Sequence, residues 1–247
     1  MILSRMMGLF STAPVFGSDA VPFSYRVFLS FLISLILFPF TSIHMMKVPG
    51  GMGEYAVIII SEVLIGILIG FLINIIFAGF QMAGEFFSVQ MGFGYTEVLD
   101  PVSQSSIPVV SQLKNLMGIM VFLVTGAHRV MIESLSLSFE KVKILNFTSE
   151  INMGIYRVIE SALGAMFVVA FKISLPILGV LILVTIAEAL MGKAAPQMNI
   201  LQLSFPAKII IGLSVLILII PQIERQMVSS IEISFDKIQS LLKAWPQ

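Results

Sequence analysis

Cysteine is absent from this chain of 247 residues, and charged side chains make up only 11% of it. The lack of cysteine excludes a disulfide-stabilised scaffold. A soluble domain carries about 25% charged residues, so these few charges cannot solvate the surface of a globule of this size. The 14 basic and 14 acidic residues cancel, which leaves no electrostatic footprint for nucleic acid. Because 57% of the residues are apolar, the chain is predicted to be a membrane protein, or one covered by apolar partners.

The residue patterns of catalytic and metal sites are also missing. The two histidines, His44 and His128, lie far apart in the sequence, and without cysteine no ligand pair has metal-binding spacing. No phosphate-binding loop, nucleophile elbow or dinucleotide fingerprint occurs in the sequence. Glu62 and Glu85 lack a second carboxylate or a histidine at helical spacing, so paired acid–base catalysis is not indicated. We therefore expect no enzyme activity, no metal and no cofactor.

The apolar runs are long enough for helices but mostly short for a bilayer. A spanning helix needs about 20 apolar residues, and only residues 63–84 clearly reach this length without a charge. The uncharged runs 115–127, 173–187 and 209–223 are shorter. Composition favours ordinary spans that tilt or thin the bilayer. The alternative is half-length helical hairpins buried against other subunits, and the faint positive-inside and aromatic-belt signals favour it modestly.

Two parts are predicted, 1–112 and 113–247, divided by a polar stretch that contains glycine, serine and proline. In the second part, the apolar spacing of residues 130–145 indicates an amphipathic helix, with a short strand at 134–139 as the alternative. Residues 231–242 repeat the helical spacing, which is typical of a helix that lies on a membrane or against a partner.

One apolar segment, residues 55–83, carries small or polar residues at every fourth position. A charge in hydrocarbon costs roughly 2.5–3.5 kcal/mol, so Glu62 should have a partner, be protonated, lie in a wet site or face the interface. Gly66 and Gly70 form a small-residue packing pattern, which more often packs helices within one chain than between subunits. We expect Gly84 to interrupt the helix and Glu85 to make a buried contact. The row consists of Glu62, Gly66, Gly70, Asn74 and Ala78.

Residues 89–112 form the least hydrophobic long segment. Gly92 and Gly94 permit unusual backbone angles, Asp100 begins a turn before proline, and Pro108 blocks a helix. Non-helical backbone is tolerated at membrane depth only inside protein or beside a water-filled cavity. The residues alone favour an external loop, and the functional alternative is a gate or plug.

Local motifs are spread over nearly the whole chain. They are Arg5-Met6-x-Gly8, Ala13-Pro14-Val15-Phe16-Gly17-Ser18, Glu62-Val63-Leu64-Ile65-Gly66-x-x-x-Gly70, Gly84-Glu85, Gln90-Met91-Gly92, Asp100-Pro101, Gly126-x-His128, Pro196-Gln197-Met198-Asn199 and Pro206-x-Lys208. Together these motifs resemble the R subunit (FliR family) of the flagellar type III protein-export gate. The family usually has more apolar residues before the Arg5 position, so the first helix here is expected to be short.

The resemblance implies an all-α integral membrane protein of helical hairpins, packed into a helical hetero-oligomeric gate in the bacterial inner membrane, within the flagellar basal body. Several apolar helices would then be too short for ordinary spans, because they pack on neighbouring subunits. Residues 1–112 would be a P-like part, and 113–247 would hold a Q-like hairpin and the amphipathic tail. The implied partners are the P and Q subunits (FliP and FliQ), the switch subunit FlhB, FlhA, membrane lipid and unfolded substrates in transit.

The same resemblance implies a role for individual residues in a channel for unfolded flagellar substrate proteins. Residues 98–112 would contain a plug that seals the channel, and Gly92 and Gly94 would be its hinge. The alternatives are the same subunit in a virulence injectisome, a small-solute permease and a scaffold without transport. The implied plug residues are Asp100, Pro101, Val102, Ser103, Gln104, Ser105, Ser106, Ile107 and Pro108. The implied subunit-packing residues are Glu62, Gly66, Gly70, Asn74, Glu85, Pro196, Gln197, Met198 and Asn199.

Overall fold

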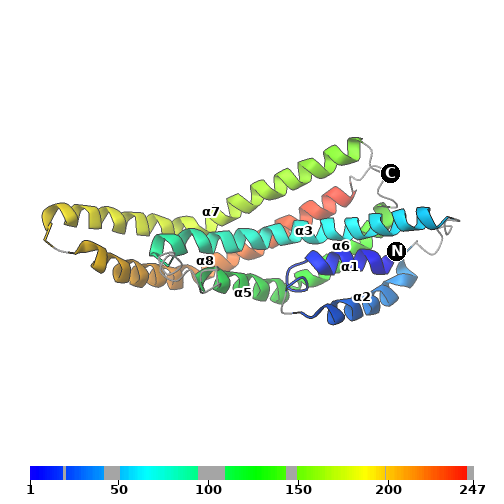
Figure 1. Cartoon of the computed structure of the whole chain (residues 1–247), viewed down its shortest axis with the longest axis horizontal. Coiled ribbons are helices and arrows are strands. Elements are labelled where there is room, and N and C mark those ends of the chain that lie inside the picture. Colours follow the sequence, from blue (N-terminus) through cyan, green and yellow to red (C-terminus); the bar gives the residue numbers. More distant parts are fainter. Residues whose placement is uncertain (19–20, 42–50, 94–108, 143–148, 198, 244–247) are drawn as a thin grey trace. The chain divides into compact units, whose positions relative to one another are not determined.

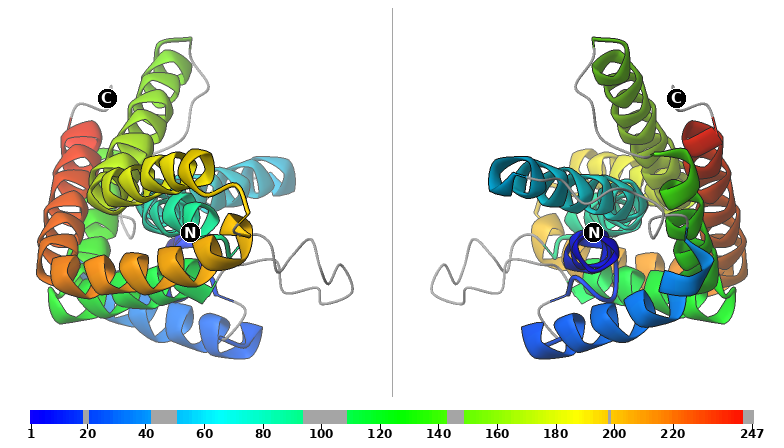
Figure 2. Two further views of the ribbon diagram at one scale, coloured as in Figure 1. Left: turned by 90° about the vertical axis from the view of Figure 1, so that its left-hand side faces the viewer. Right: turned by 90° about the vertical axis from the view of Figure 1, so that its right-hand side faces the viewer.

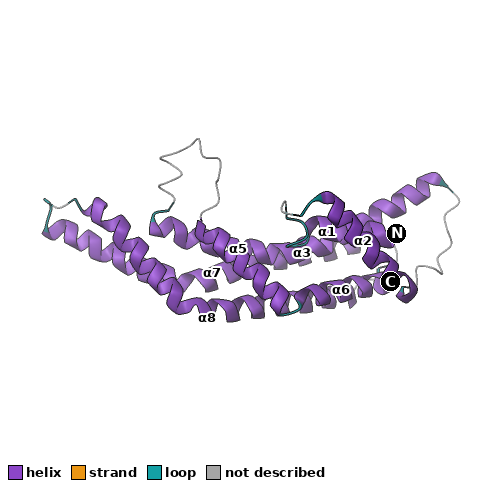
Figure 3. Ribbon diagram, turned by 90° about the horizontal axis from the view of Figure 1, so that it is seen from below, coloured by secondary structure: helices purple, strands orange, loops and turns teal. Residues whose placement is uncertain are grey.

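The computed structural model describes residues 1–18, 21–41, 51–93, 109–142, 149–197 and 199–243. Helices cover nearly all of these residues, and no strand occurs among them (Figure 3). The all-α prediction is therefore confirmed for the described part of the chain. The helices are α1 (Ile2–Thr12), α2 (Phe23–Leu37), the short 3-10 helix η1 (Phe38–Phe40), α3 (Met52–Met91), α5 (Val109–Val124), α6 (Ala127–Lys141), α7 (Ser149–Ala194) and α8 (Ile200–Lys243) (Figure 1).

Three helices are much longer than their uncharged runs. α3 has 40 residues, α7 has 46 and α8 has 44, about twice what one membrane span requires. The expectation that several apolar helices are too short is wrong for α7 and α8, because both continue through their prolines and beyond the charged residues that bound the runs. α5, with 16 residues, is short as expected. Among the described residues, four helices are long and apolar enough to cross a membrane, or five if α5 and α6 form one bent span.

Two further local expectations are wrong, and one is confirmed. Gly84 does not interrupt α3, which continues to Met91, because a single glycine costs a helix only about 1 kcal/mol. The strand alternative at residues 134–139 is wrong, since α6 covers this stretch. The first helix, α1, is short as expected, with 11 residues.

The chain divides into two compact units, and each combines segments from both sides of residue 112. Unit 1 comprises Met1–Phe77, Phe122–Ala165 and Ser230–Gln247; unit 2 comprises Ala78–Val121 and Met166–Ser229. These units do not follow the predicted boundary between a P-like and a Q-like part. That boundary concerns likeness to other subunits rather than compactness, and it stays a prediction.

Unit 1 has its core between α1, the first part of α3, α6 and the end of α8. The apolar stripe of the C-terminal tail is buried here, with Ile231 and Phe235 only 3% and 5% exposed. The expectation that this stripe lies on a membrane or a partner is thus wrong, because the chain's own core covers it. The ring of Phe235 stacks on Phe122 at 6.5 Å between centroids, and Phe122 meets Phe77 edge-on at 5.6 Å.

Much apolar surface stays uncovered by the chain itself. Only 17% of the residues are buried in α2 together with η1, and only 28% and 11% in the most apolar stretches of α7 and α8. Exposed patches of this size mark surfaces that contact lipid or other proteins. This arrangement agrees with the composition, which already required an apolar environment around the chain.

Candidate functional site

The small-residue row on α3 forms a groove, and α1 of the same chain fills it. Figure 2 shows α1, in dark blue, beside α3. A side chain added at Gly66 would collide with the carbonyl oxygen of Arg5 and would lie 2.9 Å from the backbone nitrogen of Leu9. At Gly70 an added Cβ would collide with the Thr12 hydroxyl and would lie 2.8 Å from the carbonyl oxygen of Leu9.

α1 contributes a glycine of its own to this contact. An added Cβ at Gly8 would collide with the carbonyl oxygen of Val63 and would lie 3.0 Å from the backbone nitrogen of Ile67. Two helix backbones therefore approach each other as closely as glycine permits. Packing within the chain, the more common use of such a pattern, describes Gly66 and Gly70 here. A role of these glycines in contacts between subunits stays a prediction.

The rest of the row lies apart from this groove. Asn74 and Ala78 are exposed, whereas Glu62, Gly66 and Gly70 are buried. The exposed end of the row is therefore the part that remains available to a neighbouring subunit.

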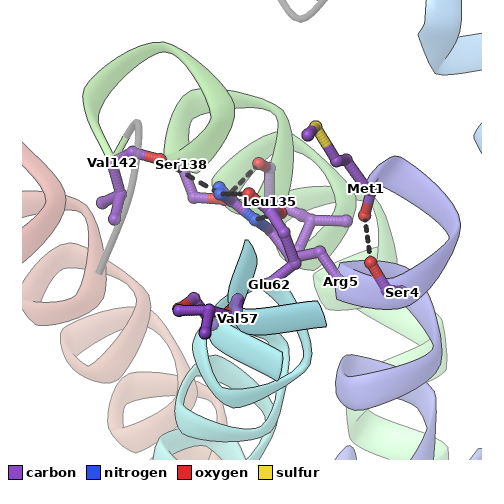
Figure 4. A network of polar contacts seen from close by, with 9 residues as sticks. Met1, Ser4, Arg5, Val57, Glu62, Leu135, Ser138 and Val142 are labelled. Atoms are coloured by element: carbon purple, nitrogen blue, oxygen red, sulfur yellow. Dashed lines mark hydrogen bonds and ion pairs between the residues drawn. The ribbon is translucent and has the colours of Figure 1, made fainter. Parts of the chain in front are cut away.

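A buried ion pair lies next to the groove, between α1 and α3 (Figure 4). Arg5 Nε donates to Glu62 Oε2 at 2.7 Å, and Arg5 Nη2 donates to Glu62 Oε1 at 2.9 Å. The two side chains are only 1% and 4% exposed. The expectation of a partner for Glu62 is confirmed, and the alternative that Glu62 faces the membrane interface is wrong. The paired geometry requires the planar fork of an arginine, which a lysine cannot supply.

Arg5 also joins both helices to the C-terminal end of α6. Its Nη1 donates to Ser138 Oγ at 2.9 Å, and its Nη2 donates to the carbonyl oxygen of Val142 at 3.0 Å. The guanidinium carbon lies 4.2 Å from the centroid of the Phe139 ring. A cation at a helix C-terminus is stabilised by the unpaired carbonyl groups there. The Arg5 side chain thus holds α1, α3 and α6 at one point.

The charge state of Arg5 follows from its surroundings. Burial lowers the pKa of the guanidinium, and the hydrogen bond and negative charge of Glu62 raise it in opposition. Arginine nevertheless stays protonated in proteins. The Arg5 guanidinium is therefore a permanent cation whose N–H groups donate to the acceptors around it.

The residues that follow α3 include the predicted plug. Gly94, the nine predicted plug residues at 100–108 and Met198 lie outside the described residues. Gly92 is described, and its φ of 94° lies in the left-handed region that favours glycine. Its N–H donates to the carbonyl oxygen of Val89 at 3.1 Å, and the N–H of Phe93 donates to that of Ser88 at 3.0 Å. These two bonds form a Schellman cap, so Gly92 ends α3 in a defined turn.

The remaining predicted packing residues have local roles. Pro196 and Gln197 lie in the turn between α7 and α8. Asn199 Oδ1 accepts a bond of 3.4 Å from the N–H of Gln202, which is the pattern of an N-cap. Glu85 is half-buried, and its Oε1 accepts a bond of 3.3 Å from Gln81 Nε2.

Two polar features were missed by sequence reasoning. Lys208 Nζ and Glu188 Oε2 form an ion pair of 3.1 Å between α8 and α7. Lys114 is fully buried, 5.8 Å above the ring of Phe87, and its Nζ finds no hydrogen-bond partner in the described chain. No sequence signal shows that Lys208 and Glu188 meet, or that Lys114 lacks an acceptor, because both facts depend on how the helices pack.

The long apolar helices and their uncovered apolar surface define the chain as an integral membrane protein. Within it, α1 packs on α3 through a tight backbone contact and a buried ion pair. In the described part of the chain, no group of three or more metal-ligating side chains occurs. Residues 1–233 match the model of the family described as "Bacterial export proteins, family 1", so the chain belongs to this family.

Its relatives have flagellar names. The flagellar biosynthetic protein FliR of Pectobacterium carotovorum subsp. carotovorum is 29% identical over 219 residues, which is 89% of this chain and 82% of the relative. FliR of Buchnera aphidicola subsp. Baizongia pistaciae is 29% identical over 241 residues, or 96% and 90% of the two chains. FliR of Borreliella burgdorferi is 27% identical over 243 residues, or 98% and 89%.

Proposed function

We propose that this chain is the FliR-type subunit of the flagellar type III export apparatus in the bacterial inner membrane. Its role is to line and seal the channel through which unfolded flagellar substrate proteins leave the cytoplasm. The observation that carries the proposal is the family match over residues 1–233. The helices fit this role, because α2, α7 and α8 leave apolar faces uncovered that lipid and other subunits would cover.

The finer assignments belong to the same proposal. The P and Q subunits (FliP and FliQ), FlhB and FlhA are its partners, residues 98–112 contribute the seal, and the chain itself catalyses no reaction. The relatives reported above are flagellar, so an injectisome is not favoured. A small-solute permease would need polar groups that converge in the membrane. Of the candidates for such a site, Glu62 is already paired with Arg5.

Complementation tests the export function. The gene for this chain would replace the R-subunit gene of a flagellated host, and secretion of hook and filament proteins would be measured. We expect secretion to be restored when the cognate P and Q subunits are supplied. A chain that is inserted and assembled with them, yet supports no secretion, would contradict the proposal.

Deletion of residues 102–108 tests the sealing role. We expect the gate to assemble and the membrane to leak ions at rest, which a potential-sensitive dye would report. A deletion variant that assembles and stays as tight as the unaltered gate would refute the seal assignment, while the export function would stand on its own test.

A further inference from the structure

One side of α7 packs inside unit 2, to which Met166–Ser229 belongs. The backbone at Met166 lies against α3, since a Cβ added at Gly79 would be 3.0 Å from the Met166 carbonyl oxygen. Further along, Glu188 pairs with Lys208 of α8, which runs back beside α7 (Figure 3). The residues of α7 that face this core and are at most 2% exposed are Ala170, Ile173, Ser174, Ile177 and Leu181.

The opposite side of α7 carries a stripe of exposed residues that the described part of unit 2 leaves uncovered. Their spacing of three and four residues places them on one face of the helix, and it is the spacing with which one helix packs along another. At 1.5 Å per residue the stripe extends about 33 Å, close to the thickness of a bilayer core. This stripe, here called the α7 seam, consists of Val168, Lys172, Leu175, Gly179, Ile182, Ile186 and Leu190.

Lys172 is the one charged residue of the α7 seam. Its side chain is exposed, and it forms no ion pair with an acidic residue of the described chain. A charge that faces hydrocarbon without a partner is costly, and such residues pair with other groups or mark a functional site. The ammonium group of Lys172 therefore needs a counter-charge from outside this chain, which is either a carboxylate of another protein or the phosphate of a lipid.

The shape of the seam favours a protein helix over lipid. Gly179 lies about two turns after Lys172, and a Cβ added there would meet no atom within 4 Å. A glycine on the uncovered face of an apolar helix allows a neighbouring backbone to approach closely. A second copy of the chain in the same orientation does not fit, because a symmetric pair would place one Lys172 opposite the other and like charges repel.

We propose that the α7 seam is the docking surface for an apolar membrane helix of a neighbouring subunit, and that this helix carries a carboxylate opposite Lys172. The ion pair sets the register of the two helices, and the gap at Gly179 lets their backbones come close. This inference rests on the proposed function, in which other subunits surround the chain. It adds the chemistry that one of these subunits must present.

The test uses the complete gate, with the chain co-expressed with its P and Q subunits. The variants are Lys172→Met, Lys172→Arg and Lys172→Glu, and the readout is the chain recovered in the purified gate, divided by the amount inserted in the membrane. Lys237→Met and Lys237→Glu are matched controls, because Lys237 is an exposed lysine on α8 in unit 1, away from the seam.

The three variants separate a protein carboxylate from lipid. We expect Lys172→Met to lower recovery several-fold, because the partner carboxylate would lose its counter-charge inside an apolar interface. Lys172→Glu should lower recovery further, since two carboxylates would then meet, whereas Lys172→Arg and both controls should assemble normally. If the seam faces lipid, Lys172→Met removes a costly charge. Recovery of this variant at or above the level of the unaltered chain would therefore overturn the inference.

Photo-crosslinking identifies the helix that covers the seam. A photo-crosslinking amino acid is placed at Leu175, which is 57% exposed beside Lys172, and at the fully buried Ile177 as control. We expect only the Leu175 position to crosslink to a membrane helix of a co-expressed subunit. Changing the acidic residue of that helix to lysine should restore assembly with Lys172→Glu. A crosslinked helix without an acidic residue, or no rescue by any of its acidic residues, would refute the inference.

These outcomes are distinct from failure of the proposed function. If the unaltered chain assembles and restores secretion while Lys172→Met assembles fully, the inference is wrong and the export function stands. If the unaltered chain is inserted but never co-purifies with the P and Q subunits, the proposed function fails and the inference falls with it.

Discussion

Removing Glu62 while Arg5 remains should destabilise the chain more than any loss of a surface charge. In the variant Glu62→Ala, the Arg5 guanidinium would lose both of its bonds to the carboxylate, at 2.7 and 2.9 Å. It would stay charged at a site where its side chain is only 1% exposed. Breaking a buried pair from one side costs about 3–5 kcal/mol. For a chain of this length, each kcal/mol shifts the unfolding temperature by about 2–4 °C, so we expect a loss of about 6–20 °C.

The assay is thermal unfolding of the purified chain in detergent, followed by circular dichroism. Glu54→Ala is the matched control, because Glu54 is an exposed glutamate in the first turn of the same helix. The double variant Arg5→Met, Glu62→Leu removes both charges and should be more stable than Glu62→Ala alone, since apolar replacement of a whole buried pair is often neutral. The reasoning fails if Glu62→Ala unfolds at the temperature of the control, or if the double variant is no better than Glu62→Ala.

Three further predictions use the same assay. Gly66→Ala should lower the unfolding temperature, because the new methyl group collides with the backbone of α1. The control Gly164→Ala should raise it slightly, because a methyl group there meets nothing within 4 Å and alanine favours the helix. Equal effects of the two variants would contradict the close packing. Lys114→Met should keep or raise stability, because the buried ammonium has no acceptor among the described residues, and a clear loss would reveal an acceptor. Phe235→Ala should lower the free energy of unfolding by about 3–5 kcal/mol. The control Ile233→Ala should lower it far less, because Ile233 is 53% exposed. Similar losses in the two variants would argue against a buried tail.

The sequence predicts a helix well where the spacing of apolar residues repeats along the segment. The apolar spacing of the C-terminal tail predicted a helix, and α8 covers it. The sequence predicts helix length less well, because a charged residue at the end of an apolar run suggests a helix boundary. Lys208 lies within α8 and pairs with Glu188 across to α7 at 3.1 Å. A charge with a partner need not end an apolar helix, and the partner is known only once the helices are packed.

In the candidate site too, the sequence indicates which residues matter but not which residues they contact. Glu62 was identified as a charge that needs a partner, yet Arg5 is 57 residues away in the sequence. The glycine row predicted a groove, and only the packed chain identifies α1 as the helix that fills it at Gly66. The left-handed turn at Gly92 was permitted by its residue type, whereas its contact with Phe205 depends on how α8 packs against α3.

The class of this protein, its all-helical character and its family can be identified without a structure. These depend on composition, on periodicity within single helices and on motifs, all of which are local properties of the chain. The packed helices were needed to show that Arg5 neutralises Glu62, that α1 occupies the α3 groove and that the apolar stripe of the tail is internal. The physical reason is that burial and pairing join residues from distant segments, so their energies depend on which helices meet.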